Sequence, residues 1–499
     1  MTVSAADRIE EQIVYGKLAS LNRYAGERLQ RMSRSPLIAE KRAFAAAVLT
    51  PRLELAHQVQ FEPEHLYALR DSVRHAFDFF AYDIAEGDVI VTADPYGGGT
   101  KGQTLTLVVP TFAGGELVPF PAIRAQMADM GGEIPGGFNE SAFELWQENM
   151  RVTPLKLYAG GKLQRDVHRF LTANSRTPDW IAADLDAMYA CCLETQRSIL
   201  LLLEQYGGET VERAIKGMFA YTSAEVLRGL PEAGSEYVGE ADIPSREASG
   251  TIRVRARRDG GTFHFDFAGT SGQQSAPYNA TPQTAKACAV IAAAANSIDE
   301  LPINEGLLET FVFHFPQGCI LSPDFPAATG LGSRLTGHAV AAAVTGALRT
   351  SGKPFVAVHG PGPWMTLYPP IGSSPSVVPV WIDPGFPVSA DGWGPAGLSG
   401  AGRLVSAEEL ELRSGFRIDS RERETDERGD EGVTVRLKVL KGTWEYQLFE
   451  PDRGSIDVSE DDHGDEGASR PLRAGDVLTF RYADAEPHGG QKGTVQDGE

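Results

Sequence analysis

Two long stretches of the chain place apolar residues three and four positions apart, a spacing that puts them on one face of a helix. The first stretch runs from Val14 to Met32 and is ended by Pro36. The second covers about residues 180–230. We therefore expect two long helical segments whose apolar stripes pack in the core or against another subunit.

Between these stretches the pattern changes to short runs rich in β-branched and aromatic residues, which favour strands. Glycine pairs at 114–115 and 260–261 lie between such runs and predict hairpin turns. The predicted elements are strands at 88–93, 104–112, 117–124, 251–269 and 310–315, and helices at about 283–297 and 336–349. This succession predicts an α+β fold with a helical N-terminal segment and mixed or antiparallel sheets in two or more domains.

A chain of 499 residues is too long for one simple core. We divide it into an N-terminal domain with a helical hairpin and glycine loops (1–234), a second α+β domain (235–410) and an acidic, partly mobile C-terminal region (411–499). In that last region, residues 420–432 and 459–469 are dense in charge and poor in apolar groups, so we expect mobile loops there. Residues 470–484 have the pattern of a closing strand pair.

The net charge of −21 argues against nucleic acid as a main partner, because phosphate binding needs clustered Lys and Arg. It also argues against docking on an anionic membrane, and the longest apolar runs are too short to span a bilayer. The four cysteines lack the spacing of a zinc site. Four scattered cysteines in so long a chain fit a reducing cytosol. The first residues are polar and lack an apolar signal core, so we expect a cytoplasmic protein.

The stretch TADPYGGGTKGQTLTLVVPTF, residues 92–112, places three glycines beside a threonine and a lysine. A phosphate-binding P-loop needs G-x-x-x-x-G-K-[ST] between a strand and a helix, so that backbone N–H groups face the phosphate. Here Lys101 is followed by Gly102, and the next segment predicts a strand, which disfavours a nucleotide site. A turn whose glycines let another group approach the backbone closely fits better.

Two further segments follow in the same region of the chain. IRAQMADMGGEIPGG, residues 123–137, follows a predicted strand, and FELWQENMRVTPLKLYAGG, residues 143–161, follows soon after. The second carries four charged residues among apolar ones: Glu144, Glu148, Arg151 and Lys156. Paired charges on such a loop can perform acid–base chemistry. A salt-bridged surface turn uses the same residues, and the residue pattern alone leaves both interpretations open.

In order along the chain, these segments resemble the hydantoinase B family, which includes the corresponding half of 5-oxoprolinase and the alpha subunit of acetone carboxylase. The family pattern is roughly N-D-P-Y-x-G-G-T-H-x-x-D, R-A-H-H-A-D-x-G-G and E-x-F-Q-E-G-x-R-[IV]-x-P-x-K-L-Y. This chain has ADPYGGGTKGQT, RAQMADMGG and ELWQENMRVTPLKLY, and further matches are ANSRTP, EQYGGETV, DFAGTSGQQSAPYN and LPINEGLL. The resemblance covers roughly residues 7–350.

This sequence departs from the family pattern at the positions of the metal ligands. In the acetone carboxylase branch, the resemblance implies a metal held by the His and Asp of T-H-x-x-D and a His of R-A-H-H-A-D. The corresponding positions here are Lys101, Thr104, Gln126 and Met127, and of the neighbouring family residues only Asp129 is kept. None of the four is a good ligand for a divalent first-row metal, and one carboxylate does not hold such an ion against water. We therefore expect no metal site in this loop. Either Lys101 places an ammonium at the cation position, or the site is inactive.

Members of this family work with a second large subunit that binds ATP, and together they activate a carbonyl by phosphorylation. The resemblance therefore implies one subunit of such a complex, without a cofactor of its own and with ATP and Mg on a hydantoinase-A-like partner. It also suggests a small zinc-binding subunit and a second hydantoinase-B-like subunit as partners. Carboxylation of a ketone, as in metal-independent acetophenone carboxylase, is slightly preferred because the manganese ligands are missing. Hydrolysis of a hydantoin or lactam ring is the next alternative.

If chemistry takes place on this chain, we expect it where the three motif segments meet. Lys101 or Arg151 would stabilise a developing enolate or phosphate, and Glu144 or Glu148 would be the general base. Asp129 completes the catalytic set. The expected substrate-binding residues are Asp94, Tyr96, Gly98, Gly99, Gly131 and Gly132.

Two other classes of function stay open from the sequence. The chain can be a non-catalytic subunit that scaffolds the complex, in which case the glycines serve turns and the charges pair with one another. The missing glycine-rich tail and the replacement of the family's V-E-T-S-Q-R segment by GLGSRLTGHA favour this alternative. A stand-alone amidohydrolase is a third possibility, but the sequence has no G-x-S-x-G or Cys/His arrangement to supply a nucleophile.

Overall fold

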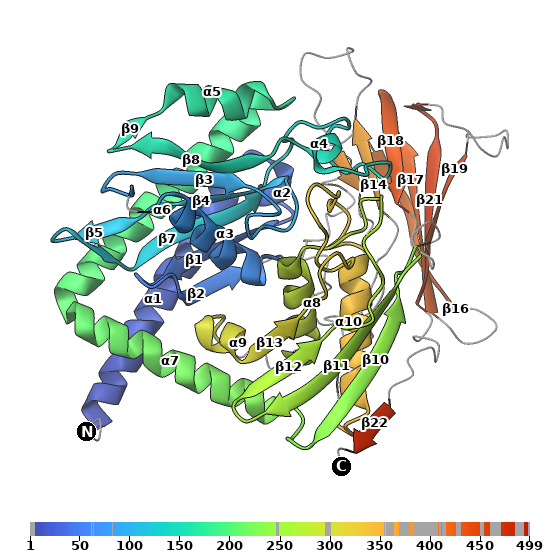
Figure 1. Cartoon of the computed structure of the whole chain (residues 1–499). Coiled ribbons are helices and arrows are strands. Elements are labelled where there is room, and N and C mark those ends of the chain that lie inside the picture. Colours follow the sequence, from blue (N-terminus) through green and yellow to red (C-terminus); the bar gives the residue numbers. More distant parts are fainter. Residues whose placement is uncertain are drawn as a thin grey trace.

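The computed structural model describes residues 5–60, 62, 64–81, 83–245, 249–294, 301–353, 355, 364–368, 380–382, 408, 411, 416–425, 431–449, 454–459, 471–484 and 494–497. In these residues a seven-stranded sheet, a five-stranded sheet and two four-stranded sheets lie beside one another (Figure 1). Helices cover the first two. The combination of helices with antiparallel and mixed sheets confirms the predicted α+β class.

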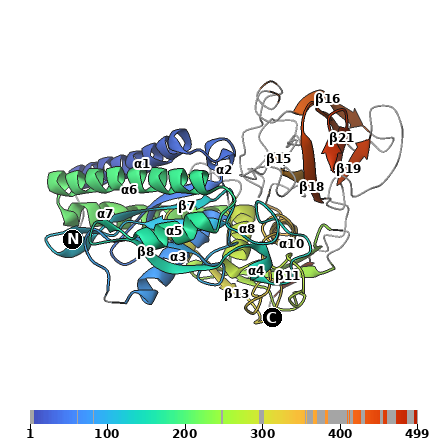
Figure 2. The same cartoon turned by 90° about the horizontal axis from the view of Figure 1, so that it is seen from above.

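Three long helices lie together on one side of the molecule (Figure 2). They are α1 (Ala5–Met32), α6 (Pro178–Tyr206) and α7 (Gly208–Gly229). Both predicted helical stretches are thus confirmed, and Gly207 divides the second one into two helices. The buried stripe of α1, which includes Val14 and Leu18, packs against Ile199 and Val211.

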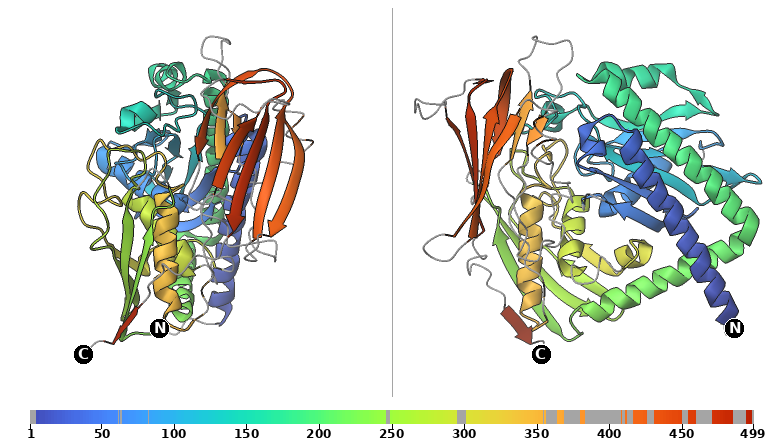
Figure 3. Two further views of the ribbon diagram at one scale, coloured as in Figure 1. Left: turned by 90° about the vertical axis from the view of Figure 1, so that its right-hand side faces the viewer. Right: turned by 180° about the vertical axis from the view of Figure 1, so that it is seen from behind.

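The first sheet is antiparallel throughout and has the spatial order β2-β1-β7-β4-β3-β8-β9. Its strands are β1 (Phe44–Leu49), β2 (Leu55–Gln60), β3 (Val89–Ala93), β4 (Thr104–Val108), β7 (Phe120–Gln126), β8 (Val152–Ala159) and β9 (Lys162–Leu163). Ala45 and Ile90 join the core that contains α3 (His65–Phe79), whereas Phe44 and Val91 join the core that contains α6. Successive side chains therefore bury opposite faces, because a strand alternates its side chains. Seen from behind, α1 and α6 lie across this sheet (Figure 3).

Prolines divide two of the predicted strands. Pro110 separates β4 from β5 (Thr111–Ala113), and Pro119 separates β6 (Glu116–Val118) from β7. Proline has no N–H to donate to a neighbouring strand, so each run breaks there. The predicted turn at 114–115 is confirmed, because β5 and β6 form an antiparallel hairpin.

The second sheet has the order β13-β12-β11-β10-β22. Its strands are β10 (Ser235–Asp242), β11 (Thr251–Asp259), β12 (Thr262–Asp266), β13 (Phe311–His314) and β22 (Thr494–Asp497). Only the β12–β13 pair among the described strand pairs of this sheet is parallel. The associated helices are α8 (Pro282–Ala294), α9 (Glu305–Glu309) and α10 (Thr336–Arg349), and α10 contacts β10 and β11. The predicted strands and helices of this region are confirmed within the described residues.

Two four-stranded sheets form the C-terminal part, around a core that includes Leu367, Phe416 and Phe480. One has the order β15-β14-β18-β20 and the other β16-β17-β21-β19. The strands are β14 (Trp364–Tyr368), β15 (Val380–Ile382), β16 (Phe416–Thr425), β17 (Glu431–Val439), β18 (Thr443–Phe449), β19 (Gly454–Ser459), β20 (Leu472–Arg473) and β21 (Val477–Asp484).

The charged stretches of this part differ from the expected loops where they are described. Residues 420–425 and 431–432 lie in β16 and β17, and Arg436 pairs with Glu422 at 3.5 Å across these strands. A strand can carry charges on its exposed face while the other face is buried, which a composition argument overlooks. Residues 426–430 and 460–469 lie outside the described residues. The predicted pair within 470–484 consists of β20 and β21, which belong to different sheets.

Three short helices complete the described elements: α2 (Pro36–Ala39), α4 (Leu145–Glu148) and α5 (Arg165–Ala173). Among the helices of the described residues, none combines the length and the apolar character that a membrane crossing requires. The four cysteines are free and buried.

Candidate functional site

The segment around α4 is joined to a loop from the second half of the chain. The Leu145 N–H donates to the carbonyl of Pro326 at 2.9 Å, and the Ala328 N–H donates to the carbonyl of Phe143 at 3.3 Å. We call this joint, formed by residues 143–151 and 324–330, the seam. It brings a predicted motif segment against residues more than 170 positions later in the chain, which the sequence pattern does not indicate.

Arg151 and Asp94 form an ion pair at the seam. Arg151 Nη2 lies 2.9 Å from Asp94 Oδ2, and the backbone N–H of Tyr96 donates to Asp94 Oδ1 at 3.0 Å. The Asp94 carboxylate is buried, whereas the Arg151 side chain is 32% exposed. The guanidinium therefore has a fixed position on a side chain that is partly exposed, and a guanidinium is suited to binding an anionic oxygen.

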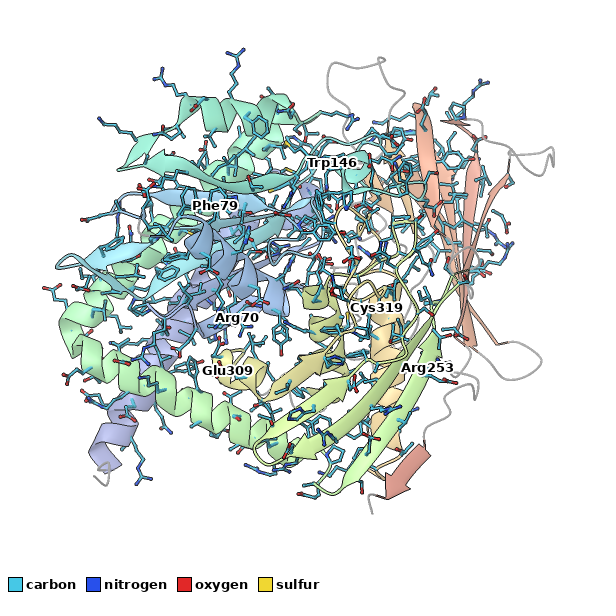
Figure 4. The ribbon with its side chains drawn as sticks, viewed as in Figure 1. Arg70, Phe79, Trp146, Arg253, Glu309 and Cys319 are labelled. Atoms are coloured by element: carbon cyan, nitrogen blue, oxygen red, sulfur yellow. The ribbon has the colours of Figure 1, made fainter. Side chains whose placement is uncertain are left out.

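A cluster of three aromatic rings lies beside this arginine and contacts it through Phe325. The Arg151 guanidinium carbon lies 4.7 Å from the ring centroid of Phe325, and Tyr96 and Trp146 pack edge-on against the same ring at 5.4 and 5.5 Å. Trp146 is 51% exposed and Phe325 is 45% exposed, and Figure 4 shows Trp146 at α4. The Tyr96 hydroxyl donates to the carbonyl of Ala327 at 2.6 Å, which ties the ring to the seam.

Glu148 lies beneath this surface and is completely buried. Its Oε1 accepts the Gly330 N–H at 2.7 Å and its Oε2 accepts the Thr329 N–H at 3.0 Å. Burial raises the pKa of Glu148 to about 8, and the two backbone hydrogen bonds offset only part of that rise. Glu144 is half-buried on the same segment, so it is the more accessible of the two carboxylates.

Lys101 lies in the interior, with an exposed fraction of 1%. Its Nζ is 2.9 Å from Oε1 of Glu64, the residue that precedes α3. Burial by itself raises the pKa of Glu64, but the charges of Lys101 and His65 and the hydrogen bonds from Ser333 and Lys101 together outweigh this effect, so the pKa lies below its ordinary value. The lysine is therefore held in a buried ion pair and does not reach the surface near Arg151.

The family's metal positions come together in the structure, but the residues at them do not fit a metal. Thr104 of β4 pairs with Gln126 of β7, and the Met127 N–H donates to the carbonyl of Gln103 at 2.8 Å. A hydroxyl, an amide and a thioether beside the Lys101 ammonium do not make a site for a manganese-like ion. No step of the chemistry is therefore assigned to a metal in this loop.

Asp129 and the glycines hold the motif loops in place. Arg176 Nη1 lies 3.2 Å from Asp129 Oδ2, and backbone N–H groups of Gly131, Gly136 and Arg176 also donate to this carboxylate. A Cβ on Gly132, which has φ +87°, would lie 2.3 Å from the carbonyl oxygen of Glu148. Asp129 thus has the contacts of a positioning residue.

The turn from Asp94 to Gly99 is likewise held in place by backbone hydrogen bonds and by a close approach at a glycine. The N–H groups of Gly97 and Gly99 both donate to the carbonyl of Asp94 at 3.1 Å. A Cβ on Gly98, with φ +88°, would lie 2.6 Å from the backbone of Asp71. Lys156 pairs with Asp88 at 3.0 Å, away from the Arg151–Asp94 pair.

The structure thus brings Asp94, Tyr96, Glu148 and Arg151 together at the seam and places Lys101 separately. Sequence reasoning missed Glu64, which lies outside the matched motifs, and Phe325, which contributes the ring under Arg151. It also assigned no role to Arg176, although this residue lies within the matched ANSRTP segment.

Comparison with known proteins agrees with the motif pattern. The family model described as Hydantoinase B/oxoprolinase matches residues 7–444. Caprolactamase subunit beta of Pseudomonas jessenii is 30% identical over 263 residues, which cover 52% of this chain and 45% of the relative. The chain spans less than two thirds of the length of the first curated relatives that it matches.

Two solved structures share the fold. The ATP-dependent caprolactamase of Pseudomonas jessenii has a TM-score of 0.83 at 22% identity, covering 97% of this chain and 91% of that chain. A nucleotide-free acetone carboxylase has a TM-score of 0.81 at 14% identity, covering 95% of this chain and 75% of that chain. At these identities the likeness concerns the fold.

Proposed function

The chain belongs to the Hydantoinase B/oxoprolinase family, and we propose that it is one subunit of an ATP-dependent enzyme complex that acts on a carbonyl compound. Within that proposal, hydrolysis of a cyclic amide is favoured. The family description names hydantoinase and oxoprolinase, and the relative with 30% identity is a caprolactamase subunit. ATP and Mg are bound by a partner subunit that resembles hydantoinase A.

The observation that carries a catalytic role is Arg151, whose guanidinium is fixed by Asp94 at 2.9 Å and whose side chain is 32% exposed. A fixed cation next to exposed aromatic rings fits a small ring whose carbonyl oxygen gains negative charge during the reaction. Preorganised charge of this kind lowers the barrier without reorganisation at the moment of reaction. Arg151 therefore stabilises the developing charge, in preference to the buried Lys101.

Glu144 is the general base in this proposal, because it is the more accessible of the two motif carboxylates, Glu144 and Glu148. Glu148 holds the seam together through its two backbone hydrogen bonds. Tyr96 and Phe325 provide the apolar surface against which the ring of the substrate lies.

A scaffolding subunit is the second candidate function. It is supported by the internal pairing of the site charges, since Lys101, Arg151 and Asp129 each have a charged partner within the chain. Ketone carboxylation is slightly preferred from the sequence. In that reaction, as in cyclic amide hydrolysis, Arg151 would stabilise negative charge that develops on an oxygen, so both substrate classes are included in one test.

The test begins with the complex purified from its own cells and the identification of each subunit by native mass spectrometry. Substrate-dependent ADP release is then measured with lactams, hydantoins and ketones plus bicarbonate. Arg151→Met is expected to lower kcat about 100-fold or more, and Arg151→Lys to lower it less. Arg169→Met changes an exposed arginine of α5 and is the matched control. Full turnover by Arg151→Met would favour the scaffold, and a chain without a partner would contradict the complex.

A further inference from the structure

Three side chains of the types that bind metals meet in the interior beside Lys101. One ligand atom each of Glu62, Glu64 and His65 can be chosen so that all three lie within 4.8 Å of one another. The three residues are 5%, 2% and 0% exposed. Two carboxylates and an imidazole form a donor set that suits manganese, iron or zinc.

His65 gives an independent sign that this cluster is built for a ligand. Neither of its ring nitrogens has a hydrogen-bond partner among the described residues, although the side chain is fully buried. Nε2 lies 3.5 Å from Glu62 Oε2, too far for a strong hydrogen bond. A buried imidazole normally has a partner for at least one nitrogen, because desolvation without a hydrogen bond is costly.

Lys101 supplies the positive charge of the cluster. Its Nζ lies 2.9 Å from Glu64 Oε1 and 5.7 Å from the ring centroid of Phe138. A second cation, Arg124, is also fully buried and interacts electrostatically with Glu64 and Glu62. Two carboxylates thus face two cations, which is the balance that buried charges need.

Removal of the lysine charge would upset this balance. The cluster would keep two carboxylates against one cation, and the space of the lysine side chain would open beside Glu64. A divalent ion would restore positive charge there and would give His65 a partner. The donor positions needed for such an ion are already present before the lysine is removed.

We propose that Lys101 is a built-in substitute for a metal ion, whose ammonium fills the cation position of a divalent-metal site formed by Glu62, Glu64 and His65. This ligand set is separate from the motif positions Thr104, Gln126 and Met127, which lack suitable donors. The proposal concerns ion binding and stability, so it does not rest on the proposed function.

The test compares three full-length proteins: the wild type, Lys101→Ala and the double variant Lys101→Ala/Glu64→Gln. Each is treated with a chelator, supplied with MnCl2 or ZnCl2 and freed of unbound ion. Lys101→Ala is expected to retain about one ion per chain and to gain several degrees in Tm when the ion is added, because the ion binds the folded state. The wild type and the double variant should retain almost none and show no shift. MgCl2 is the control ion, since Mg²⁺ prefers oxygen ligands.

A folded Lys101→Ala that retains no more metal than the wild type would overturn the proposal. A wild type that retains one ion per chain with Lys101 in place would overturn it as well. If Lys101→Ala does not fold without metal, Mn²⁺ or Zn²⁺ should rescue its refolding. Lys101→His, which adds an imidazole at the same position, serves as a second variant. Failure of both variants to bind or to refold with these ions also overturns the proposal.

Discussion

Glu148 Oε1 lies 2.7 Å from the backbone nitrogen of Gly330, a residue 182 positions later in the chain. Because Oε2 accepts the Thr329 N–H as well, one buried carboxyl holds the end of α4 against the loop that precedes α10. The ion pair of Arg151 with Asp94 lies at the same joint. Any change at Glu148 is therefore expected to affect the candidate site through its position as well as through stability.

The protonation of Glu148 makes stability depend on pH. Its pKa is about 8 in the folded protein and 4.5 ordinarily, so the folded state holds this proton more tightly than the unfolded state. The resulting stabilisation is fully present below pH 4.5 and is lost as the pH rises through 8. Between these two pH values, the free energy of unfolding of the wild type, relative to that of Glu148→Gln, should fall by about 1.4 kcal/mol per pH unit.

Urea unfolding of both proteins at pH values from 5 to about 9 measures that difference. Using the difference cancels the other titrating groups, which both proteins share. The Glu148→Gln substitution itself lowers the free energy of unfolding by about 1–3 kcal/mol, because the amide of glutamine cannot accept hydrogen bonds from both backbone N–H groups. A difference that stays constant with pH would show that Glu148 is ionised in the folded protein.

The turn after β3 is expected to tolerate no side chain at Gly98. Gly98 and Gly115 have almost the same φ, +88° and +86°, so an alanine would have a similar backbone strain at both positions. At Gly98 the new Cβ would also lie 2.6 Å from the backbone of Asp71, whereas nothing lies within 4 Å at Gly115. Gly98→Ala should thus lose about 1–3 kcal/mol more stability than Gly115→Ala. Equal losses in chemical denaturation would contradict this contact.

Removal of Arg176 leaves the buried Asp129 carboxylate without its charged partner. Arg176→Ala should lower the free energy of unfolding by about 1–3 kcal/mol, since three backbone N–H groups remain on the carboxylate. Arg169→Ala, on the exposed face of α5, is the control and should change it by less than about 0.5 kcal/mol. Similar unfolding midpoints for the two variants would mean that the Arg176–Asp129 pair contributes little.

The cysteines should be unreactive in the folded protein. All four are buried, and burial raises the pKa of Cys191 to about 11, so little thiolate is present at pH 8. Ellman's reagent is expected to label fewer than about one thiol per chain within minutes under native conditions, and all of them in guanidinium chloride. Rapid labelling of the native protein would show that the packing around at least one of these cysteines opens.

Elements with a clear local period could be predicted from the sequence. The small-residue helix at 336–349 coincides with α10, and the glycine pair at 114–115 forms the β5–β6 turn. β1 was missed because its six residues, FAAAVL, are all buried and show no alternation of polar and apolar positions. A strand buried on both faces carries no period that marks it as a strand.

The same limitation applies to the candidate site. Arg151 and Asp94 could be proposed because both lie in recognisable motifs. Glu64 precedes α3, a helix without a motif, and reaches Lys101 only through the packing of α3 against the first sheet. Phe325 reaches Arg151 through the seam. Contacts between segments this far apart depend on tertiary packing and leave no local signal.

The position of β22 has a consequence for synthesis of the protein. Residues 494–497 pair with β10 at residues 235–238, so the ribosome makes this edge of the second sheet some 250 residues before its neighbour. Until the last strand emerges, the backbone groups of β10 on that side are open to pairing with another chain. Nascent chains on one messenger RNA are thus exposed to mispairing at β10 while about 250 further residues are synthesised, and the emergence of β22 ends that exposure.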